Sequence, residues 1–126
     1  MKQLSSSLED YLECVYNHIK KNGSVKAVEI SKKLNVSRAS VTEALNKLAQ
    51  IQYINYGRYE NISMTNLGIK KAEEIFAKHN LLQEFFETVL KIETSESADL
   101  ACKIEHIVSN NVMNKIKNFM DEYVKK

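Results

Sequence analysis

The sequence lacks the features that mark several classes of protein. Its two cysteines, Cys14 and Cys102, do not show the repeated spacing that predicts a disulfide framework. No apolar run approaches the roughly 20 residues that a membrane-spanning helix needs, and the amino terminus has no signal-peptide core. Internal repeats and low-complexity segments are absent as well. We therefore expect a cytoplasmic protein with reduced thiols and no membrane partner.

The net charge is small, but the charges are distributed unevenly. The 126 residues carry a net charge of +2, and 44% of them are hydrophobic, which suffices for one domain or two small ones. From Lys20 to Arg58, eight basic residues stand against two acidic ones. From Thr65 onward, nine lysines stand against ten acidic residues. This distribution predicts a phosphate-contacting module followed by a module with another task.

The first half of the chain has the pattern of a DNA-binding unit. Helical periodicity predicts three helices over about residues 7–21, 26–34 and 38–50, the third capped by Ser37. Alternating residues over 53–64 then predict a β-hairpin with a basic tip. The alternative is that three amphipathic helices pack together without binding DNA. We expect DNA contacts from the outward face of the third helix and from the tip of the hairpin, at Ser37, Arg38, Ser40, Thr42, Glu43, Asn46, Lys47 and Arg58.

Helical periodicity continues in the second half of the chain. A long helical stretch is predicted over residues 65–77, and the apolar cluster over residues 81–90 is too dense for one helix face. Such excess hydrophobicity in a small chain is more typical of a dimer interface than of a hydrophobic core within one subunit. Residues 93–98 are expected to form a polar connector, followed by helices over about residues 101–108 and 110–124.

These elements together predict the fold class and the domain organisation. The fold is expected to be mainly α, with an N-terminal winged helix-turn-helix that carries a small β-hairpin wing over residues 1–64. An all-helical domain over residues 65–126 is expected to bind metal and to dimerise.

Several residues have the chemistry and spacing of metal ligands. Cys102, Glu105 and His106 stand at positions i, i+3 and i+4, which on a helix directs a thiol, a carboxylate and an imidazole to one side. Acids near a helix start, a surface histidine or a buried thiol also occur without metal, so each position has an ordinary explanation. These three residues supply only part of the ligand set that a metal ion needs. Asp10, Glu13 and His79 could supply further ligands from elsewhere in the chain.

Four segments of the chain resemble one known family. Residues 8–13, 37–48, 78–82 and 102–106 are similar to the diphtheria toxin repressor and manganese transport regulator family of metal-dependent transcriptional repressors, in its two-domain form. The resemblance covers essentially the whole chain. It implies a winged helix-turn-helix, a helical dimerisation domain and a divalent metal bound between them. It also implies a metal-loaded homodimer that binds operator DNA and represses genes for iron or manganese uptake.

The resemblance implies a particular set of ligands. Asp10 and Glu13 match the two carboxylate ligands of the manganese-sensing branch of the family, and His79 matches its bridging histidine. Glu105 and His106 match a glutamate and a histidine that both branches share. Cys102 departs from the manganese branch, which has glutamate there, and agrees with the iron branch. Gln83 and Ala98 stand where the iron branch has its ancillary glutamate and histidine. The implied site is therefore a hybrid that consists of Asp10, Glu13, His79, Cys102, Glu105 and His106.

Ligand chemistry favours some metals over others. Carboxylates suit hard ions such as Mn²⁺, whereas a thiolate at Cys102 favours Fe²⁺, Co²⁺ or Zn²⁺. We expect Fe²⁺ rather than Mn²⁺ as the physiological metal, with Zn²⁺ or Co²⁺ able to bind in vitro. The ligand set is compatible with one dominant metal site and with a pair of metal sites that share Glu13 and His79.

Two other functions fit parts of this pattern. A metal-independent winged-helix regulator that responds to a small organic ligand would use the same DNA-binding unit. A small zinc hydrolase could use Cys102 and His106 as ligands and Glu105 as base. The chain offers no recognisable nucleophile or phosphate loop for such a reaction, so we expect no enzymatic activity.

Overall fold

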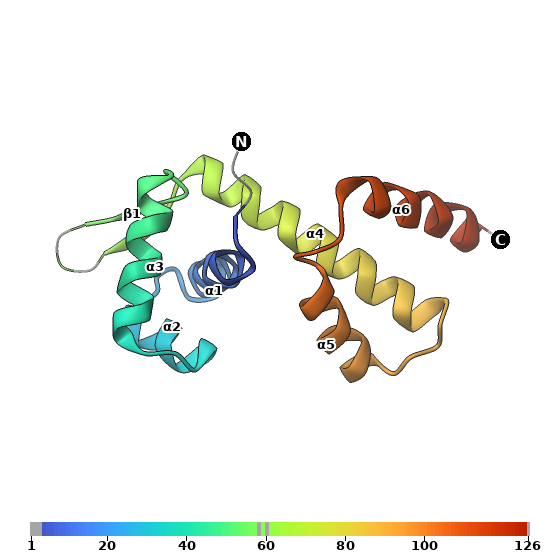
Figure 1. Ribbon diagram of the computed structural model, residues 1–126, viewed down its shortest axis with the longest axis horizontal. Coiled ribbons are helices and arrows are strands. Elements are labelled where there is room, and N and C mark those ends of the chain that lie inside the picture. Colours follow the sequence, from blue (N-terminus) through green and yellow to red (C-terminus); the bar gives the residue numbers. More distant parts are fainter. Residues whose placement is uncertain (1–3, 58, 60, 126) are drawn as a thin grey trace. The chain divides into compact units, whose positions relative to one another are not determined.

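The computed structural model describes residues 4–57, 59 and 61–125, which form helices and one β-hairpin (Figure 1). Arg58, expected at the tip of the hairpin, lies outside these residues. The chain divides into two compact units, residues 1–73 and 74–126, and the boundary falls inside the fourth helix. The elements are α1 (Ser6–Asn22), α2 (Ala27–Leu34), α3 (Arg38–Gln50), β1 (Ile54–Tyr56), β2 (Ile62–Met64), α4 (Asn66–Thr88), α5 (Thr94–Ile104) and α6 (Asn110–Lys125).

Local sequence signals set the ends of the first three helices. The hydroxyl of Ser5 accepts a hydrogen bond from a backbone N–H in the first turn of α1, and Gly23 ends that helix with a φ of 83°. Asn35 ends α2 in the left-handed region, where asparagine is tolerated. The hydroxyl of Ser37 accepts from the backbone N–H of Ser40 at 3.1 Å and so caps α3, as predicted.

The amino-terminal unit buries one apolar face of each of these helices. Helical periodicity predicts Val41, Ala44, Leu45 and Leu48 as the inward positions of α3. All four are buried, which confirms the assignment of its two faces. The same core takes in the strand residue Ile54. Its largest fully buried side chains are Leu12, Val15, Ile30, Val41, Leu45, Leu48 and Ile54.

The predicted hairpin is present as an antiparallel pair of short strands. Ile54 lies opposite Met64, and Tyr56 lies opposite Ile62. Both strands begin with a buried isoleucine and continue with an exposed polar residue, so only one face of the pair meets the helical core. The hairpin and the three helices together form the predicted winged helix-turn-helix.

A close backbone approach fixes the start of α4 against the residue before the hairpin. The backbone N–H of Thr65 donates to the carbonyl of Tyr53 at 3.2 Å. The Thr65 hydroxyl donates to the carbonyl of Gln52 at 2.6 Å and accepts from the backbone N–H of Gly68 at 3.0 Å. A β-carbon at Gly68 would lie 1.8 Å from the carbonyl oxygen of Tyr53. Only glycine fits at this position without a shift of the backbone.

The carboxy-terminal unit has its own core. Leu82 and Phe86 of α4, Ala101 of α5 and Met113 of α6 form a buried cluster. The ammonium group of Lys78 donates to a backbone carbonyl in the loop before α6 at 2.9 Å, which ties that loop to α4. Among the residues described, no helix combines the length and apolar character needed to cross a lipid bilayer.

Two predictions for this unit were wrong. Residues 93–98 are not a connector, because Glu93 is the N-cap of α5 and the helix begins at Thr94. The polar Ser97 is fully buried, and its hydroxyl donates to the carbonyl of Ile92 at 3.1 Å. The helix expected over residues 101–108 ends at Ile104, and Ile107 is 77% exposed in the turn that follows.

Candidate metal-binding residues and DNA-binding surface

The outward face of α3 carries the polar side chains expected to contact DNA. Its exposed polar residues lie opposite the buried stripe of the helix, and their contact with DNA stays a prediction. Ser37 also has a structural role, because its hydroxyl caps the helix and donates to the hydroxyl of Ser40 at 3.0 Å. The exposed polar residues are Arg38, Ser40, Thr42, Glu43, Asn46 and Lys47.

Two of these exposed residues form an ion pair with each other. The ammonium group of Lys47 lies 3.2 Å from a carboxylate oxygen of Glu43, one turn earlier, and both side chains are well exposed. Such i,i+4 surface pairs contribute only about 0.3–0.5 kcal/mol, because solvent screens them. Lys47 can therefore leave Glu43 for a phosphate at little cost.

The structure adds further polar groups to this surface. A depression of about 440 Å³ lies where the start of α2, the start of α3 and the wing meet. Lys26, Arg38 and Asn61 line it, and Tyr59 of the wing is 90% exposed beside it. Sequence reasoning did not select Lys26 or Asn61. The signal available for Lys26 was its place directly before a short amphipathic helix within the basic segment.

Three acids on α1 differ in their surroundings. Glu9 is buried, and one of its carboxylate oxygens lies 3.9 Å from the ammonium group of Lys71. Asp10 and Glu13 are half-buried, and each offers a carboxylate oxygen within 4.8 Å of the other. Two like charges at that separation repel, and a cation held by both relieves the repulsion. Asp10 and Glu13 therefore have the chemistry of hard-metal ligands.

A histidine and a buried glutamate meet in the carboxy-terminal unit. Glu105 is 1% exposed, and its Oε1 lies 3.4 Å from Nδ1 of His79 on α4. Glu105 is also the C-cap of α5, where the negative end of the helix dipole disfavours another negative charge. Burying a carboxylate costs several kcal/mol unless a cation offsets it. An imidazole and a buried carboxylate at this distance fit a divalent transition metal.

The other two predicted ligands of this unit lie in different settings. Cys102 is on α5 and exposed, whereas Glu105, three residues later, is buried. His106 is half-buried and lies in the turn after the helix. The spacing predicted one helix face for all three residues, but α5 ends at Ile104, before the second and third of them.

Gln83, which stands where the iron branch has its ancillary glutamate, contacts His79 directly. Its side-chain oxygen lies 3.1 Å from Nε2 of His79, one helical turn earlier on α4. The i,i+4 spacing was the available signal, because residues four apart on a helix are neighbours.

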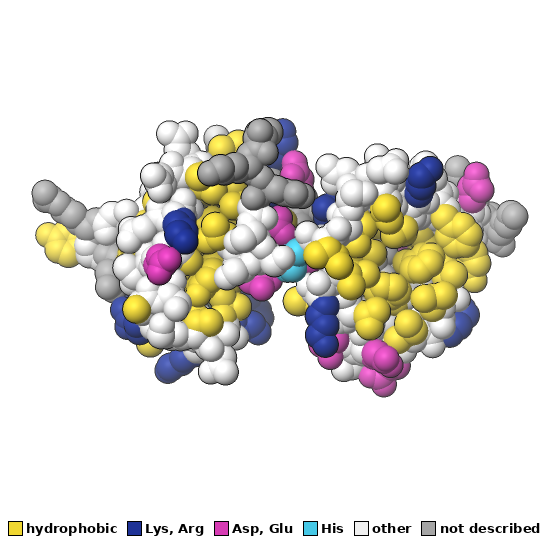
Figure 2. Space-filling model, viewed as in Figure 1, with side chains coloured by type: hydrophobic (Ala, Val, Ile, Leu, Met, Phe, Trp, Pro, Cys, Tyr) yellow, Lys and Arg dark blue, Asp and Glu magenta, His cyan; other side chains and the backbone are white. Residues whose placement is uncertain are grey.

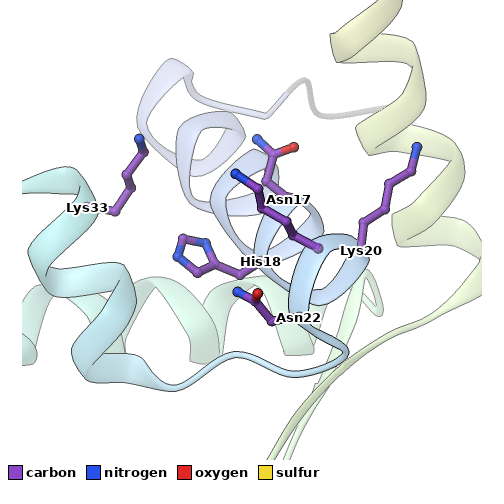
Figure 3. Close-up of a pocket in the computed structure, with 6 residues that line it drawn as sticks. Asn17, His18, Lys20, Asn22 and Lys33 are labelled. Carbon is purple, nitrogen blue, oxygen red and sulfur yellow. The ribbon is translucent and has the colours of Figure 1, made fainter.

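The amino-terminal unit also has a basic pocket, of about 830 Å³, shown in Figure 3. No residue predicted to bind metal or DNA lines it. Its lysines lie near the ends of α1 and α2, where the helix dipole favours cations, so their presence needs no ligand. The lining residues are Asn17, His18, Lys20, Lys21, Asn22 and Lys33.

His18, which lines this pocket, contacts Cys14 one turn earlier on α1. Nδ1 of His18 is 2.9 Å from the backbone carbonyl oxygen of Cys14 and 3.7 Å from its sulfur. Burial raises the pKa of the Cys14 thiol to about 11. A thiol that stays neutral is a poor metal ligand, so Cys14 acts as a packing residue.

Hydrophobic side chains gather on the surface of the carboxy-terminal unit, at the right of Figure 2. The ring of Phe119 on α6 lies 6.2 Å from that of Phe85 on α4 and stacks on Tyr123 at 5.7 Å. Phe119 is nevertheless 47% exposed. Leu90, Val112, Tyr123 and Val124 are exposed as well. An apolar surface of this kind is typical of a protein interface.

Both halves of the chain match family models. Residues 3–62 match the iron dependent repressor, N-terminal DNA binding domain. Residues 65–125 match the iron dependent repressor, metal binding and dimerisation domain.

Several known proteins are similar to this protein along most of its chain. An uncharacterised HTH-type transcriptional regulator of Methanocaldococcus jannaschii is 36% identical over 95% of this chain and 97% of its own length. The HTH-type transcriptional regulator MntR of Oceanobacillus iheyensis is 32% identical over 93% of this chain and 79% of its own. The structure of ScaR with bound Zn²⁺ is 29% identical and superimposes with a TM-score of 0.79, over 90% of this chain and 53% of that one. The chain thus spans about half the length of that structure.

Proposed function

Because the chain belongs to the iron-dependent repressor family of metal-dependent transcriptional repressors, we propose that it is a metal-activated repressor of genes for metal-ion uptake. In this proposal a DNA-binding domain over residues 1–64 is joined to a metal-binding and dimerisation domain over residues 65–126. Its partner is operator DNA, so we place it in the cytoplasm. The observation that carries the metal dependence is the buried carboxylate of Glu105 beside His79.

The proposed ligands come from both units of the chain. A divalent cation, when bound, supplies the positive charge that offsets several carboxylates at once. Ligands on α1 and ligands on α4, α5 and the turn after α5 would hold that cation in common. The two units would then keep one relative orientation. The proposed ligands are Asp10, Glu13, His79, Cys102, Glu105 and His106.

The orientation matters because a dimer reads two half-sites at once. Two copies of α3 reach successive major grooves only when they are about 34 Å apart or a multiple of that distance. Ligands shared by the two units would favour the orientation that satisfies this spacing, and so would shift a population of states toward the DNA-binding one. The polar residues of α3 would then contact phosphates and base edges, with Arg58 at the wing.

We propose that the dimer forms through the apolar surface around Phe119. The exposed rings and aliphatic side chains of α6 supply the apolar core that a stable interface requires. The likeness of the second half to a dimerisation domain supports this assignment.

For the metal, we propose Fe²⁺ in preference to Mn²⁺. ScaR is described as a manganese-activated repressor, and two of its structures contain Zn²⁺ and Cd²⁺ respectively. The preference here rests on Cys102, because a thiolate favours softer ions over Mn²⁺.

A gel-shift experiment under anaerobic conditions tests the proposal. DNA duplexes are selected from a random library once with metal and once with chelator, and binding is compared in chelator, Mn²⁺, Fe²⁺ and Zn²⁺. We expect binding only with metal, and its loss in Asp10→Ala but not in Asn17→Ala, an exposed position on the same helix. Equal binding in chelator would replace the proposal with a metal-independent winged-helix regulator. A stronger response to Mn²⁺ than to Fe²⁺ would overturn only the metal preference.

A further inference from the structure

We propose that Lys78 is a positioning residue for the turn that follows α5, over residues 105–108. Its ammonium group ties the end of this turn to α4. This tie keeps Glu105 and His106 within reach of His79, so that one metal can bind all three. The inference rests on the proposed function, because it concerns the proposed ligands. It also makes a claim about the metal-free protein that can be tested alone.

A hydrogen bond from a charged donor joins the turn to α4. Nζ of Lys78 donates to the backbone carbonyl oxygen of Val108 at 2.9 Å, which is a usual length for such a bond. An ammonium group has three donors and no acceptor, so the direction of this bond is certain. Lys78 is half-buried, and water therefore competes less for its donors than it does at an exposed lysine.

Proposed metal ligands lie close to both ends of this bond. On α4, Lys78 is directly followed by His79. In the turn, Val108 comes two residues after His106 and three residues after Glu105. The side chains of His79 and Glu105 already lie 3.4 Å apart, so a shift of the turn changes whether one ion can contact both.

The turn itself is only partly packed. Ile107 is 77% exposed, and the backbone N–H groups of Ile107 and Val108 both donate to the carbonyl of Ile104, at the end of α5. These bonds are local and do not reach α4. The side chain of Val108 packs against the core of the unit, but an apolar contact is not directional. The bond from Lys78 adds the direction that this contact lacks.

The charge of Lys78 and its positioning role predict opposite effects on metal affinity. A positive charge near a metal site repels the cation, so the loss of the charge alone predicts tighter binding. The loss of the tie predicts weaker binding, by roughly 10-fold to 100-fold, as is typical when a group that orients metal ligands is removed. The sign of the change therefore distinguishes the two explanations.

The test compares the full-length protein with three variants. Lys78→Met keeps an unbranched side chain without the donor, and Lys78→Arg keeps a charged donor. Lys103→Met removes the charge of an exposed lysine on α5, next to Cys102, and is the matched control. Hydrogen–deuterium exchange of the metal-free proteins, followed by NMR, reports on the backbone amides of Ile107 and Val108. We expect both amides to exchange roughly 10-fold faster in Lys78→Met, and at the parent rate in the other two variants.

A Co²⁺ titration of the same proteins, followed by visible absorption, measures the affinity. We expect Lys78→Met to weaken binding by roughly 10-fold to 100-fold, and Lys78→Arg to restore it. Lys103→Met should leave the affinity unchanged or raise it. Melting curves in chelator show whether each variant folds. Lys78→Gln, whose side chain is shorter than that of lysine, replaces Lys78→Met if that variant does not fold.

The two measurements separate this inference from the proposed function. Unchanged exchange in Lys78→Met, or Co²⁺ binding that is unchanged or tighter, overturns the role of Lys78. If the unaltered protein binds no Co²⁺ at all, the proposed function fails, and with it the effect of Lys78 on metal affinity. The exchange rates then still decide whether Lys78 holds the turn.

Discussion

Replacing Glu105 by glutamine tests whether this residue is a metal ligand or only a structural residue. Glutamine has almost the same shape as glutamate but no charge, so Glu105→Gln removes a negative charge from a site that is 1% exposed. Burying one ion costs several kcal/mol, and glutamine at this position removes that cost from the metal-free protein. We therefore expect the metal-free variant to be at least as stable as the metal-free parent protein.

Metal should affect the two proteins differently. At a free metal concentration about 100 times Kd, binding to the folded state adds about 2.7 kcal/mol of stability. For a protein of this size, that corresponds to a rise in melting temperature of roughly 10 °C. Glu105→Gln should lose most of this rise, because an amide oxygen is a much weaker ligand than a carboxylate.

Differential scanning calorimetry with chelator and with saturating Mn²⁺ measures both effects. Asp99→Asn, which removes an exposed carboxylate from the same helix, is the matched control and should retain the full rise. The reasoning is refuted if Glu105→Gln melts several degrees below the parent protein in chelator and still shows the full rise with metal. Glu105 would then be a structural partner of His79.

Three further predictions concern other parts of the molecule. A thiol reagent at about pH 8 should label Cys102, which is exposed, within minutes, and should label Cys14 only on unfolding, because a pKa of about 11 leaves roughly one thiol in a thousand ionised. Gly68→Ala should lower the free energy of unfolding, measured in urea, by about 3 kcal/mol, because its β-carbon would meet a backbone carbonyl at 1.8 Å. Phe119→Glu should convert the proposed dimer to a monomer in analytical ultracentrifugation, because it places a charge on the exposed apolar surface.

Matched variants control two of these predictions. Gly57→Ala adds the same methyl group where no atom lies within 4 Å, so a loss of stability equal to that of Gly68→Ala would contradict the steric argument. Asn118→Glu adds the same charge at an exposed position next to Phe119. If it dissociates the dimer equally, charge on α6 and not the apolar surface is responsible.

The amino-terminal fold was predictable because its signals are local. Ser37 is a strong N-cap, Asn22-Gly23 ends a helix, and the change from helical to alternating periodicity marks the hairpin. In α5 such signals were misleading. Ser97 is polar, so its segment was predicted to be a connector. In the structure Ser97 is buried, and its hydroxyl donates a hydrogen bond to the carbonyl of Ile92, which precedes the helix. Apolar periodicity alone overlooks a polar residue that is satisfied inside the core.

The spacing of residues along the sequence could not predict contacts between segments that are far apart in the sequence. His79 on α4 and Glu105, the C-cap of α5, are 26 residues apart, and no sequence pattern predicts the 3.4 Å between their side chains. The spacing of Cys102 and Glu105 predicted a common direction for both, but one is exposed and the other is buried. Spacing predicts which residues are neighbours on a helix, whereas burial depends on what packs against it.

The acids of α1 show how structure separates residues that the sequence treats alike. Glu9, Asp10 and Glu13 all lie in the first half of one helix, and Glu9 is in its first turn, where the dipole favours negative charge. Glu9 is buried 3.9 Å from Lys71 of the same unit, so a lysine within the fold offsets its charge. Asp10 and Glu13 approach each other within 4.8 Å, and two carboxylates at that distance gain most from a cation between them. The same helix thus carries one acid suited to an internal ion pair and two suited to a metal, a division that depends on tertiary contacts.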